Sequence, residues 1–136
     1  MKYSDQKPPN WDKLVELFKV DWKNTVVTYG DTIHAIRPVT PDLEVHEAVH
    51  MKQQMATGIA EWWSYYYTDP QFRIAQEIPA YRAQFLFLTR NTADRNLIFK
   101  IQDKLARDLA GTQYGKCITY HDAFAMIGRA QRAVAA

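Results

Sequence analysis

The sequence predicts an α+β fold that is mostly helical, with one small antiparallel β-hairpin ahead of its central helix. Apolar residues recur at helical spacing along most of the chain. By contrast, residues 25–37 are rich in β-branched side chains and carry Gly30-Asp31 at their centre, which is typical of a tight hairpin turn. With 136 residues, of which 47 % are hydrophobic, the chain can bury one core without disulfides. We therefore expect a single domain over residues 1–136.

The first predicted elements are a polar lead, a short helix and the hairpin. Residues 1–9 are polar and end in two prolines, so we expect a flexible lead. Helical spacing of apolar residues then predicts an amphipathic helix over 11–20, with Asn10 as its N-cap. The hairpin strands are expected near 25–29 and 32–37, and Pro38 ends the second strand.

The central helix has clear start and stop signals. Thr40 can cap its first turn, Pro41 suits the first helical position, and Asp42 adds a favourable negative charge there. We expect this helix over residues 41–56, and Gly58 is a typical stop. The aromatic segment that follows is expected to form one or two helical turns.

Three further helices are predicted in the second half of the chain. One starts near residue 70, and Pro79 predicts a kink or a late start within it. Residues 91–94, which end in Asp94, are expected to cap the next helix, and Gly111 closes it. The last helix is expected from Thr119 to about residue 134. The predicted apolar face of the helix before Gly111 consists of Leu97, Ile98, Ile101, Leu105 and Leu109.

Composition argues against several kinds of partner. The formal net charge is only +2 and no dense Lys/Arg run is present, so no nucleic-acid partner is expected. No signal peptide and no transmembrane run is visible in the sequence, so we expect a cytoplasmic protein with no membrane partner. Cys117 is the single cysteine; it cannot form an internal disulfide and is interpreted as a structural thiol. The sequence gives no indication of the oligomeric state.

Residues 42–54, DLEVHEAVHMKQQ, contain the pattern H-E-x-x-H at His46, Glu47 and His50. Helical residues four apart share one face, so both imidazoles can bind one metal ion. Glu47 is about 100° around the helix from His46. It is therefore misplaced as a third ligand, but it can accept a proton from a water on the ion. The pattern would arise in roughly 0.4 % of shuffled chains of this composition, which weighs against the alternative of a core helix with two buried histidines.

A catalytic zinc ion needs a third protein ligand from elsewhere in the chain. The pattern that adds a histidine six residues after His50 fails, because Ala56 stands there. We choose Glu77, which falls on the next substantial helix among apolar neighbours, after a segment in which the chain can reverse. The alternatives are Glu61, Asp69 and His121.

Three segments, HEAVHMKQQ, WWSYYYTDP and EIPAYRAQ, together resemble the small zincin-type metallopeptidase domains of phage and bacterial proteins. Those domains belong with the gluzincins, whose motif is H-E-x-x-H followed by E-x-x-A or E-x-x-D. The resemblance covers about residues 30–90. It implies a zincin-like fold in which His46, His50 and Glu77 bind one Zn²⁺ ion and Glu47 is the general base.

Several aromatic side chains are candidates for a catalytic role. Tyr81 shares a helix face with Glu77, and we predict that it hydrogen-bonds a ligand or stabilises an oxyanion, with core packing as the alternative. The oxyanion role could instead fall to one of the other candidates, which are Tyr65, Tyr66, Tyr67, Tyr120 and His121.

Charged side chains and the hairpin edge could support the site. Arg82 could pair with a carboxylate, including a substrate C-terminus. An edge of the hairpin, at residues 26–29 or 33–37, could pair with an extended peptide. The carboxylates that could accept the second N–H of a metal-bound histidine are Asp42, Glu44, Glu61 and Asp69.

The sequence therefore predicts a zinc-dependent metallopeptidase that hydrolyses a peptide bond in a peptide or protein substrate, with Glu47 as the base. One alternative is a non-catalytic module of the same fold that serves a structural or interaction role in a larger assembly. Another is a helical binding domain that holds no metal.

Overall fold

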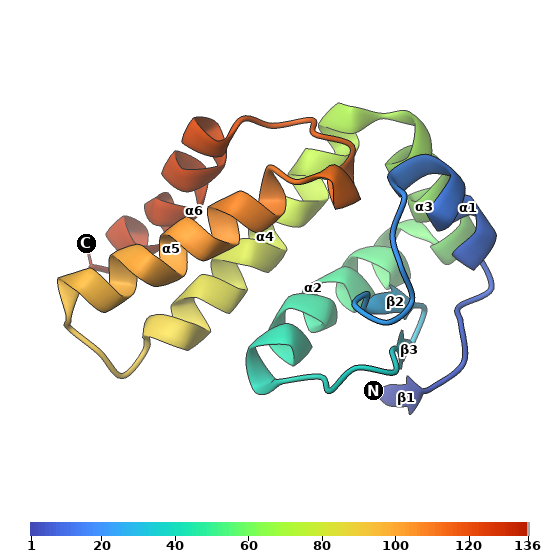
Figure 1. Cartoon of the computed structure of the whole chain (residues 1–136), viewed down its shortest axis with the longest axis horizontal. Helices are drawn as coiled ribbons and strands as arrows, with labels where there is room; N and C mark the ends of the chain where they lie inside the picture. Colours follow the sequence, from blue (N-terminus) through green and yellow to red (C-terminus); the bar gives the residue numbers. More distant parts are fainter. Residues whose placement is uncertain (136) are drawn as a thin grey trace.

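The protein is described by a computed structural model, which gives the backbone of residues 1–135 and the side chains of residues 1–129. It is mostly helical with one small sheet, which confirms the predicted α+β class. The elements, labelled in Figure 1, are β1 (Lys2–Ser4), α1 (Trp11–Phe18), β2 (Val27–Tyr29), β3 (Thr32–His34), α2 (Pro41–Thr57), α3 (Ile59–Thr68), α4 (Pro70–Thr89), α5 (Arg95–Leu109), the 3₁₀ turn η1 (Thr112–Tyr114) and α6 (Tyr120–Ala135).

The sheet contains the predicted hairpin and one strand that was not predicted. Strands β2 and β3 pair antiparallel around Gly30, whose φ of 63° favours glycine. Strand β1 pairs parallel with β3, so the sheet order is β1-β3-β2. The prediction that residues 1–9 form a flexible lead is wrong for Lys2–Ser4, the residues of β1. Backbone hydrogen bonds hold them to the sheet, while their side chains stay largely exposed.

Helix α2 ends where the sequence predicted, and the aromatic helix after it is longer than predicted. Gly58 has a φ of 104°, which a side chain would strain, and its N–H closes the last turn of α2 on the carbonyl of Gln54. The chain then turns directly into α3, whose ten residues exceed the one or two turns expected.

Helix α4 begins at Pro70, so the late start proposed for it is wrong. Its N-cap is Asp69, whose carboxylate accepts hydrogen bonds from the N–H groups of Gln71 and Phe72. The helix continues without a break through Pro79, a residue exposed to solvent.

Most of the predicted helix ends are confirmed. Asp94 caps α5, and the hydroxyl of Thr119 accepts the N–H of Asp122 at the start of α6. Three details differ. Asn10 precedes α1, but its side chain donates to Tyr67 instead of capping the helix. Thr40 precedes α2, but its hydroxyl donates to the carboxylate of Asp42 and accepts no backbone N–H of the helix. Leu97 is 44 % exposed and lies outside the apolar face of α5.

The apolar core has two parts, on either side of the α2–α4 pair (Figure 1). The first lies between α4, α5 and α6 and is built mainly from aliphatic side chains, whereas the second lies between α1, the hairpin and α3 and is mainly aromatic. The fully enclosed members of the first include Phe85, Ala106, Leu109 and Ile127, and the second contains Trp11, Leu14, Phe18, Val27, Trp62, Trp63 and Tyr66. None of the helices in the described part of the chain is both long and apolar enough to cross a membrane.

Candidate metal centre

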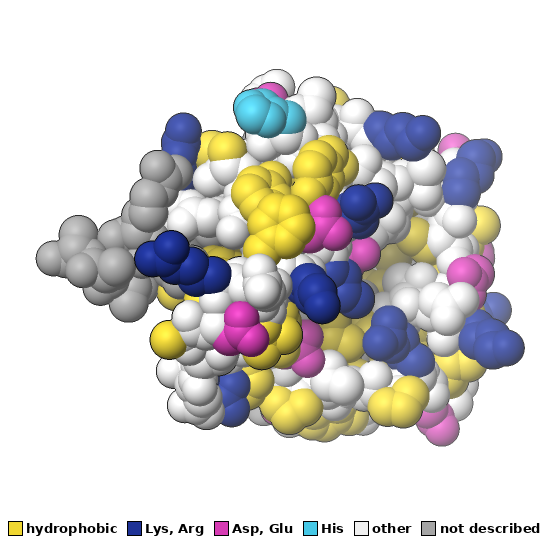
Figure 2. Space-filling view, turned by 60° about the vertical axis from the view of Figure 1, so that its left-hand side comes forward, with side chains coloured by type: hydrophobic (Ala, Val, Ile, Leu, Met, Phe, Trp, Pro, Cys, Tyr) yellow, Lys and Arg dark blue, Asp and Glu magenta, His cyan; other side chains and the backbone are white. Residues whose placement is uncertain are grey.

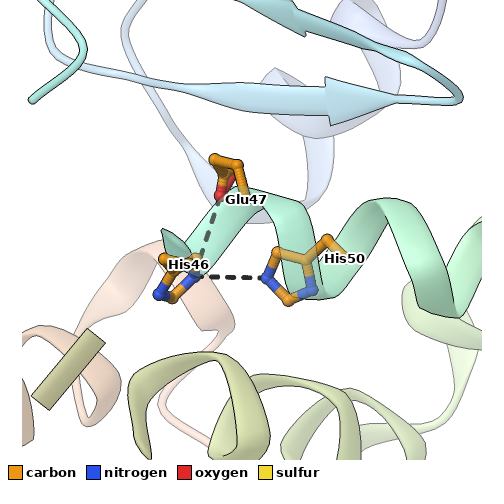
Figure 3. A group of neighbouring side chains, drawn as sticks. All are labelled: His46, Glu47 and His50. Atoms are coloured by element: carbon orange, nitrogen blue, oxygen red, sulfur yellow. Dashed lines mark hydrogen bonds and ion pairs between the residues drawn. The ribbon is translucent and has the colours of Figure 1, made fainter. Parts of the chain in front are cut away.

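Helix α2 brings the two histidines of the motif onto one buried face. His46 and His50 are each 5 % exposed. Their Nε2 atoms lie 3.2 Å apart. A dashed line joins the facing nitrogens in Figure 3, and the two rings point at a common position. Glu47, also buried, leaves the helix on the side of the strands (Figure 3), with its Oε2 at 3.8 Å from Nε2 of His46. The buried group of His46, Glu47 and His50 could bind a metal ion.

Glu77 reaches the same position from the neighbouring helix α4. Its Oε1 lies 3.3 Å from Nε2 of His46 and 3.1 Å from Nε2 of His50. Its other oxygen, Oε2, accepts a 2.7 Å hydrogen bond from the hydroxyl of Tyr66, which fixes the carboxylate with Oε1 toward the histidines. Three potential ligand atoms thus form a nearly equilateral triangle with sides of 3.1, 3.2 and 3.3 Å.

This triangle has the size of one face of a tetrahedral metal site. Bonds of about 2.0–2.1 Å at tetrahedral angles separate ligand atoms by about 3.3–3.4 Å. Two sets of three residues share the histidines, one with Glu47 and one with Glu77. The set with Glu77 has the shorter distances and the more regular geometry. A proton could bridge only one pair of these atoms at a time, whereas one cation could contact all three.

The charges at the centre are strongly coupled. Burial by itself lowers the pKa of His50, but the adjacent Glu77 carboxylate outweighs burial and raises that pKa to about 9. Burial by itself raises the pKa of Glu77, but the charge of His50 and the hydrogen bonds from both imidazoles hold it well below its usual range. The centre is therefore suited to hold positive charge between these side chains.

Glu47 has a different environment from Glu77. It is 5 % exposed, and burial raises the pKa of its carboxyl group. Its hydrogen-bond partner is the hydroxyl of Thr28 on β2, at 3.4 Å from Oε1. A buried carboxylate with a raised pKa, beside a metal position, is a suitable proton acceptor.

The second nitrogen of each imidazole is bonded to a glutamine, which the sequence did not predict. Nδ1 of His46 lies 2.9 Å from Oε1 of Gln84, and Nδ1 of His50 lies 2.9 Å from Oε1 of Gln53. Of the four carboxylates proposed for this role, Asp42 comes nearest, because its Oδ2 accepts from Nε2 of Gln84. None of the four bonds a histidine of the motif directly.

A cavity of about 490 Å³ opens beside the centre. Its walls are α1 and the segment leading into β2 on one side, and α4 with the residues around η1 on the other. The motif residues, Glu77, Tyr81 and Tyr114 all line it.

Tyr81 and Tyr114 form a hydroxyl pair in this cavity. The ring of Tyr81 packs edge-on against His46 with centroids 4.6 Å apart, and its hydroxyl lies 2.7 Å from that of Tyr114. Burial, followed by nearby charged and phenolic groups, raises the pKa of both tyrosines well above the usual value, so both keep their protons. The buried Arg73 holds Tyr114 in place, because its guanidinium donates to the backbone carbonyls of Tyr114 and Tyr66. Tyr114 lies 33 residues from Tyr81, and no local pattern marks it.

The three residues considered as alternative third ligands lie away from the histidine pair. Glu61 is exposed in the first turn of α3, Asp69 caps α4, and His121 is exposed at the start of α6. None of them lines the cavity.

The remaining candidates for an oxyanion donor also lie apart from the cavity, with one exception. Tyr65 is 53 % exposed, and the hydroxyl of Tyr67 accepts from Asn10. The hydroxyl of Tyr120 donates to the carboxylate of Asp103 on the surface of α5 and α6. On this side of the molecule hydrophobic side chains lie among Lys and Arg side chains (Figure 2). Tyr66 lines the cavity, but its hydroxyl is bonded to Glu77.

Two further predictions are corrected in part. Arg82 donates to the carbonyl of Met126 and has no carboxylate partner among the described residues, so its pairing with a substrate C-terminus stays a prediction. Strand β3 lies between β1 and β2, so residues 32–34 offer no free edge, and the edge beside α2 belongs to β2. Cys117 is part-buried and its thiol donates to the carbonyl of Tyr114.

Comparisons of the chain with protein-family models, with curated proteins and with solved structures found no match.

Proposed function

We propose that the protein is a zinc-dependent metallopeptidase, with His46, His50 and Glu77 as the zinc ligands and Glu47 as the general base. The observation that carries this proposal is the triangle of Nε2, Nε2 and Oε1 atoms with sides of 3.1–3.3 Å. Two imidazoles and one carboxylate are a ligand set of catalytic zinc, which keeps a further position open. The resemblance of the motif segments to gluzincins supports the same assignment.

Bound zinc would supply Lewis acidity, which makes a neighbouring water acidic near neutral pH and polarises a carbonyl group. Glu47 would accept the proton of the attacking water at its carboxylate and return it to the leaving amine. Its burial and its raised pKa favour a carboxyl group that exchanges a proton during the reaction.

The tyrosine pair would stabilise the negatively charged oxygen that develops on the substrate carbonyl. Only one hydroxyl hydrogen can lie in the bond between Tyr81 and Tyr114, so the other can be donated to an oxygen in the cavity. Both hydroxyls stay protonated because their pKa values are raised. Either tyrosine can therefore be the oxyanion donor.

The substrate class that fits this cavity is a peptide in extended conformation. Strand β2 is an edge of the sheet, and Val26 and Val27 line the cavity. Main-chain groups at such an edge can hydrogen-bond a substrate backbone, which favours peptides over other amides.

The test is cleavage of a mixture of unstructured peptides by the zinc-loaded protein, with products identified by mass spectrometry. Glu47→Gln should retain zinc and lower the cleavage rate by about 10²–10⁴-fold, the usual contribution of a general base. The matched control is Glu44→Gln, a change on the same helix at a residue outside the cavity, which should cleave at the parent rate. Equal rates for Glu47→Gln and the parent would remove Glu47 as the base. A parent protein that binds zinc but cleaves no peptide would favour the non-catalytic module instead.

A further inference from the structure

The two histidines of the centre are held by glutamine amides that come from opposite helices. Gln84, on α4, reaches His46 on α2, and its own Nε2 returns to Asp42 on α2 at 2.8 Å. Gln53, on α2, contacts His50 one turn away, and its Nε2 crosses to the backbone carbonyl of Gln76 on α4 at 2.9 Å. Each imidazole is thus the end of a hydrogen-bonded chain that spans the interface between α2 and α4.

The chemistry of the outer groups fixes which end of each amide faces the histidine. The carboxylate of Asp42 and the carbonyl of Gln76 can only accept hydrogen bonds, so the amide N–H groups must point to them. The amide oxygens of Gln84 and Gln53 must then face the imidazoles. The assignment of each amide follows from its outer partner and does not depend on the histidine.

The amide orientation in turn fixes the protons of the imidazoles. An amide oxygen accepts and cannot donate, so Nδ1 of His46 and Nδ1 of His50 must each carry a hydrogen. Without a metal ion, Nε2 can also carry a hydrogen and donate it to Glu77. In the neutral ring, which is the form that binds a metal, Nε2 has a free lone pair. The Nε2 atoms of both rings point to the position that Oε1 of Glu77 also faces.

Metal-bound histidines commonly donate this second N–H to a carboxylate, which makes the ring a stronger ligand. Here both acceptors are neutral, and the carboxylate at the outer end of the chain, Asp42, is separated from His46 by one amide. Among the described residues, Glu77 is the one whose carboxylate oxygen lies within 3.3 Å of an imidazole nitrogen of His46 or His50.

We propose that Gln84, backed by Asp42, and Gln53 are positioning residues that set both imidazoles with Nε2 toward the metal, through neutral amides in place of carboxylates. The inference rests on the metal centre proposed above. The neutral amides orient the imidazoles but do not make them stronger ligands, as a carboxylate would. Moving a carboxylate onto the histidine should therefore tighten metal binding.

The chain Asp42–Gln84–His46 allows a test by exchange of its two outer groups. In Asp42→Asn with Gln84→Glu, the new amide N–H can donate to the new carboxylate, and that carboxylate can accept Nδ1–H of His46. The exchange keeps every hydrogen bond of the chain and brings the negative charge to the ring. Gln84→Leu breaks the chain, as Gln53→Leu does for the chain at His50. The matched control is Gln102→Leu, because Gln102 is also part-buried and bonded through its Nε2, but to the carbonyl of Phe124.

Zinc affinity is measured by competition with a chromogenic chelator, and folding of each variant by circular dichroism. Gln84→Leu and Gln53→Leu should weaken zinc binding by about 10–100-fold. The exchange variant should bind zinc more tightly than the parent, and the control should bind it as tightly as the parent. In the metal-free protein, nitrogen-15 spectra of the histidine side chains should show Nδ1 protonated at both rings in the parent. In metal-free Gln84→Leu, His46 alone should gain the tautomer that carries its hydrogen on Nε2.

The outcomes separate the two proposals. A parent that binds no zinc would overturn the metal centre itself. A parent that binds zinc, with Gln84→Leu and Gln53→Leu binding as tightly, would overturn the positioning role alone. The positioning role also fails if the exchange variant folds but binds zinc as weakly as Gln84→Leu, because the amides would then be only structural.

Discussion

Helix α4 packs on two opposite sides, and the two interfaces have opposite chemistry. Toward α2 it buries Glu77 and Gln84, which are bonded to the histidine pair. Toward α5 and α6 it buries Ile78 and Phe85 against an apolar cluster. The side of α4 that faces α2 thus depends on hydrogen bonds of defined direction. The side that faces α5 and α6 depends only on the burial of apolar side chains.

The difference separates what stabilises the fold from what shapes the site. Burial of apolar surface is non-directional and accounts for most of the free energy of folding. Buried polar groups contribute little net stability, but each must meet a partner of the right geometry. We therefore expect changes at the apolar interface to reduce the free energy of unfolding, and changes at the polar interface to act mainly on metal binding.

The largest expected effect is at the apolar interface. Phe85 is fully buried, so Phe85→Ala should lower the free energy of unfolding by about 3–5 kcal/mol. The matched control is Phe99→Ala on α5, since Phe99 is 56 % exposed, and its effect should stay below about 1 kcal/mol. Urea unfolding followed by circular dichroism measures both. Equal losses would mean that the two phenylalanines do not differ in burial as described.

The next effect concerns the metal itself. Zinc present at a hundred times its dissociation constant should raise the free energy of unfolding by about 2.7 kcal/mol, and a chelator should reverse this gain. In Glu77→Gln a dissociation constant raised about 100-fold would reduce the gain to about 0.4 kcal/mol at the same zinc concentration. Glu61→Gln, at an exposed glutamate, should keep the full gain. A full gain in Glu77→Gln would move the third ligand elsewhere.

A smaller effect is expected where α2 meets the sheet. Gln54 is fully buried, donates to the carbonyl of Thr28 and accepts the N–H of Gly30. Gln54→Leu would leave both backbone groups without a partner and should lower the free energy of unfolding by about 2 kcal/mol. Gln71→Leu, at an exposed glutamine, should leave it within about 0.5 kcal/mol of the parent. If the two variants unfolded at the same urea concentration, Gln54 would not join the helix to the hairpin.

The smallest effect is at the start of α4. Asp69→Ala removes the acceptor of two backbone N–H groups and should lower the free energy of unfolding by about 1 kcal/mol. Zinc affinity should be unchanged, because Asp69 is a cap and not a ligand. A loss of zinc affinity in this variant, measured by chelator competition, would restore Asp69 as a candidate ligand.

Local sequence signals were sufficient for most of the fold. Apolar spacing predicted the helices, and Asp94, Thr119 and Gly58 marked helix ends that the structure confirms. Strand β1 could not be predicted because its side chains are largely exposed and its contacts are backbone hydrogen bonds to a distant strand. Leu97 fits the helical period of α5, yet tertiary packing leaves it at the surface.

For the site, the sequence sufficed only where spacing along one helix determines proximity. His46, Glu47 and His50 came from the motif, and Glu77 was chosen because it falls on the next substantial helix, after a segment in which the chain can reverse. Gln84 and Tyr114 could not be found in this way. They lie 38 residues from His46 and 33 from Tyr81, and glutamine or tyrosine at such distances carries no local signal.

X-ray absorption at the zinc edge of the zinc-loaded protein is the decisive experiment for the metal centre. We predict one ion per chain with two imidazole nitrogens and at least one carboxylate oxygen at about 2.0–2.2 Å. Loss of one imidazole in His50→Ala and loss of the carboxylate in Glu77→Gln should follow. A spectrum with a sulfur ligand, or one unchanged by both substitutions, would rule out His46, His50 and Glu77 as the ligand set.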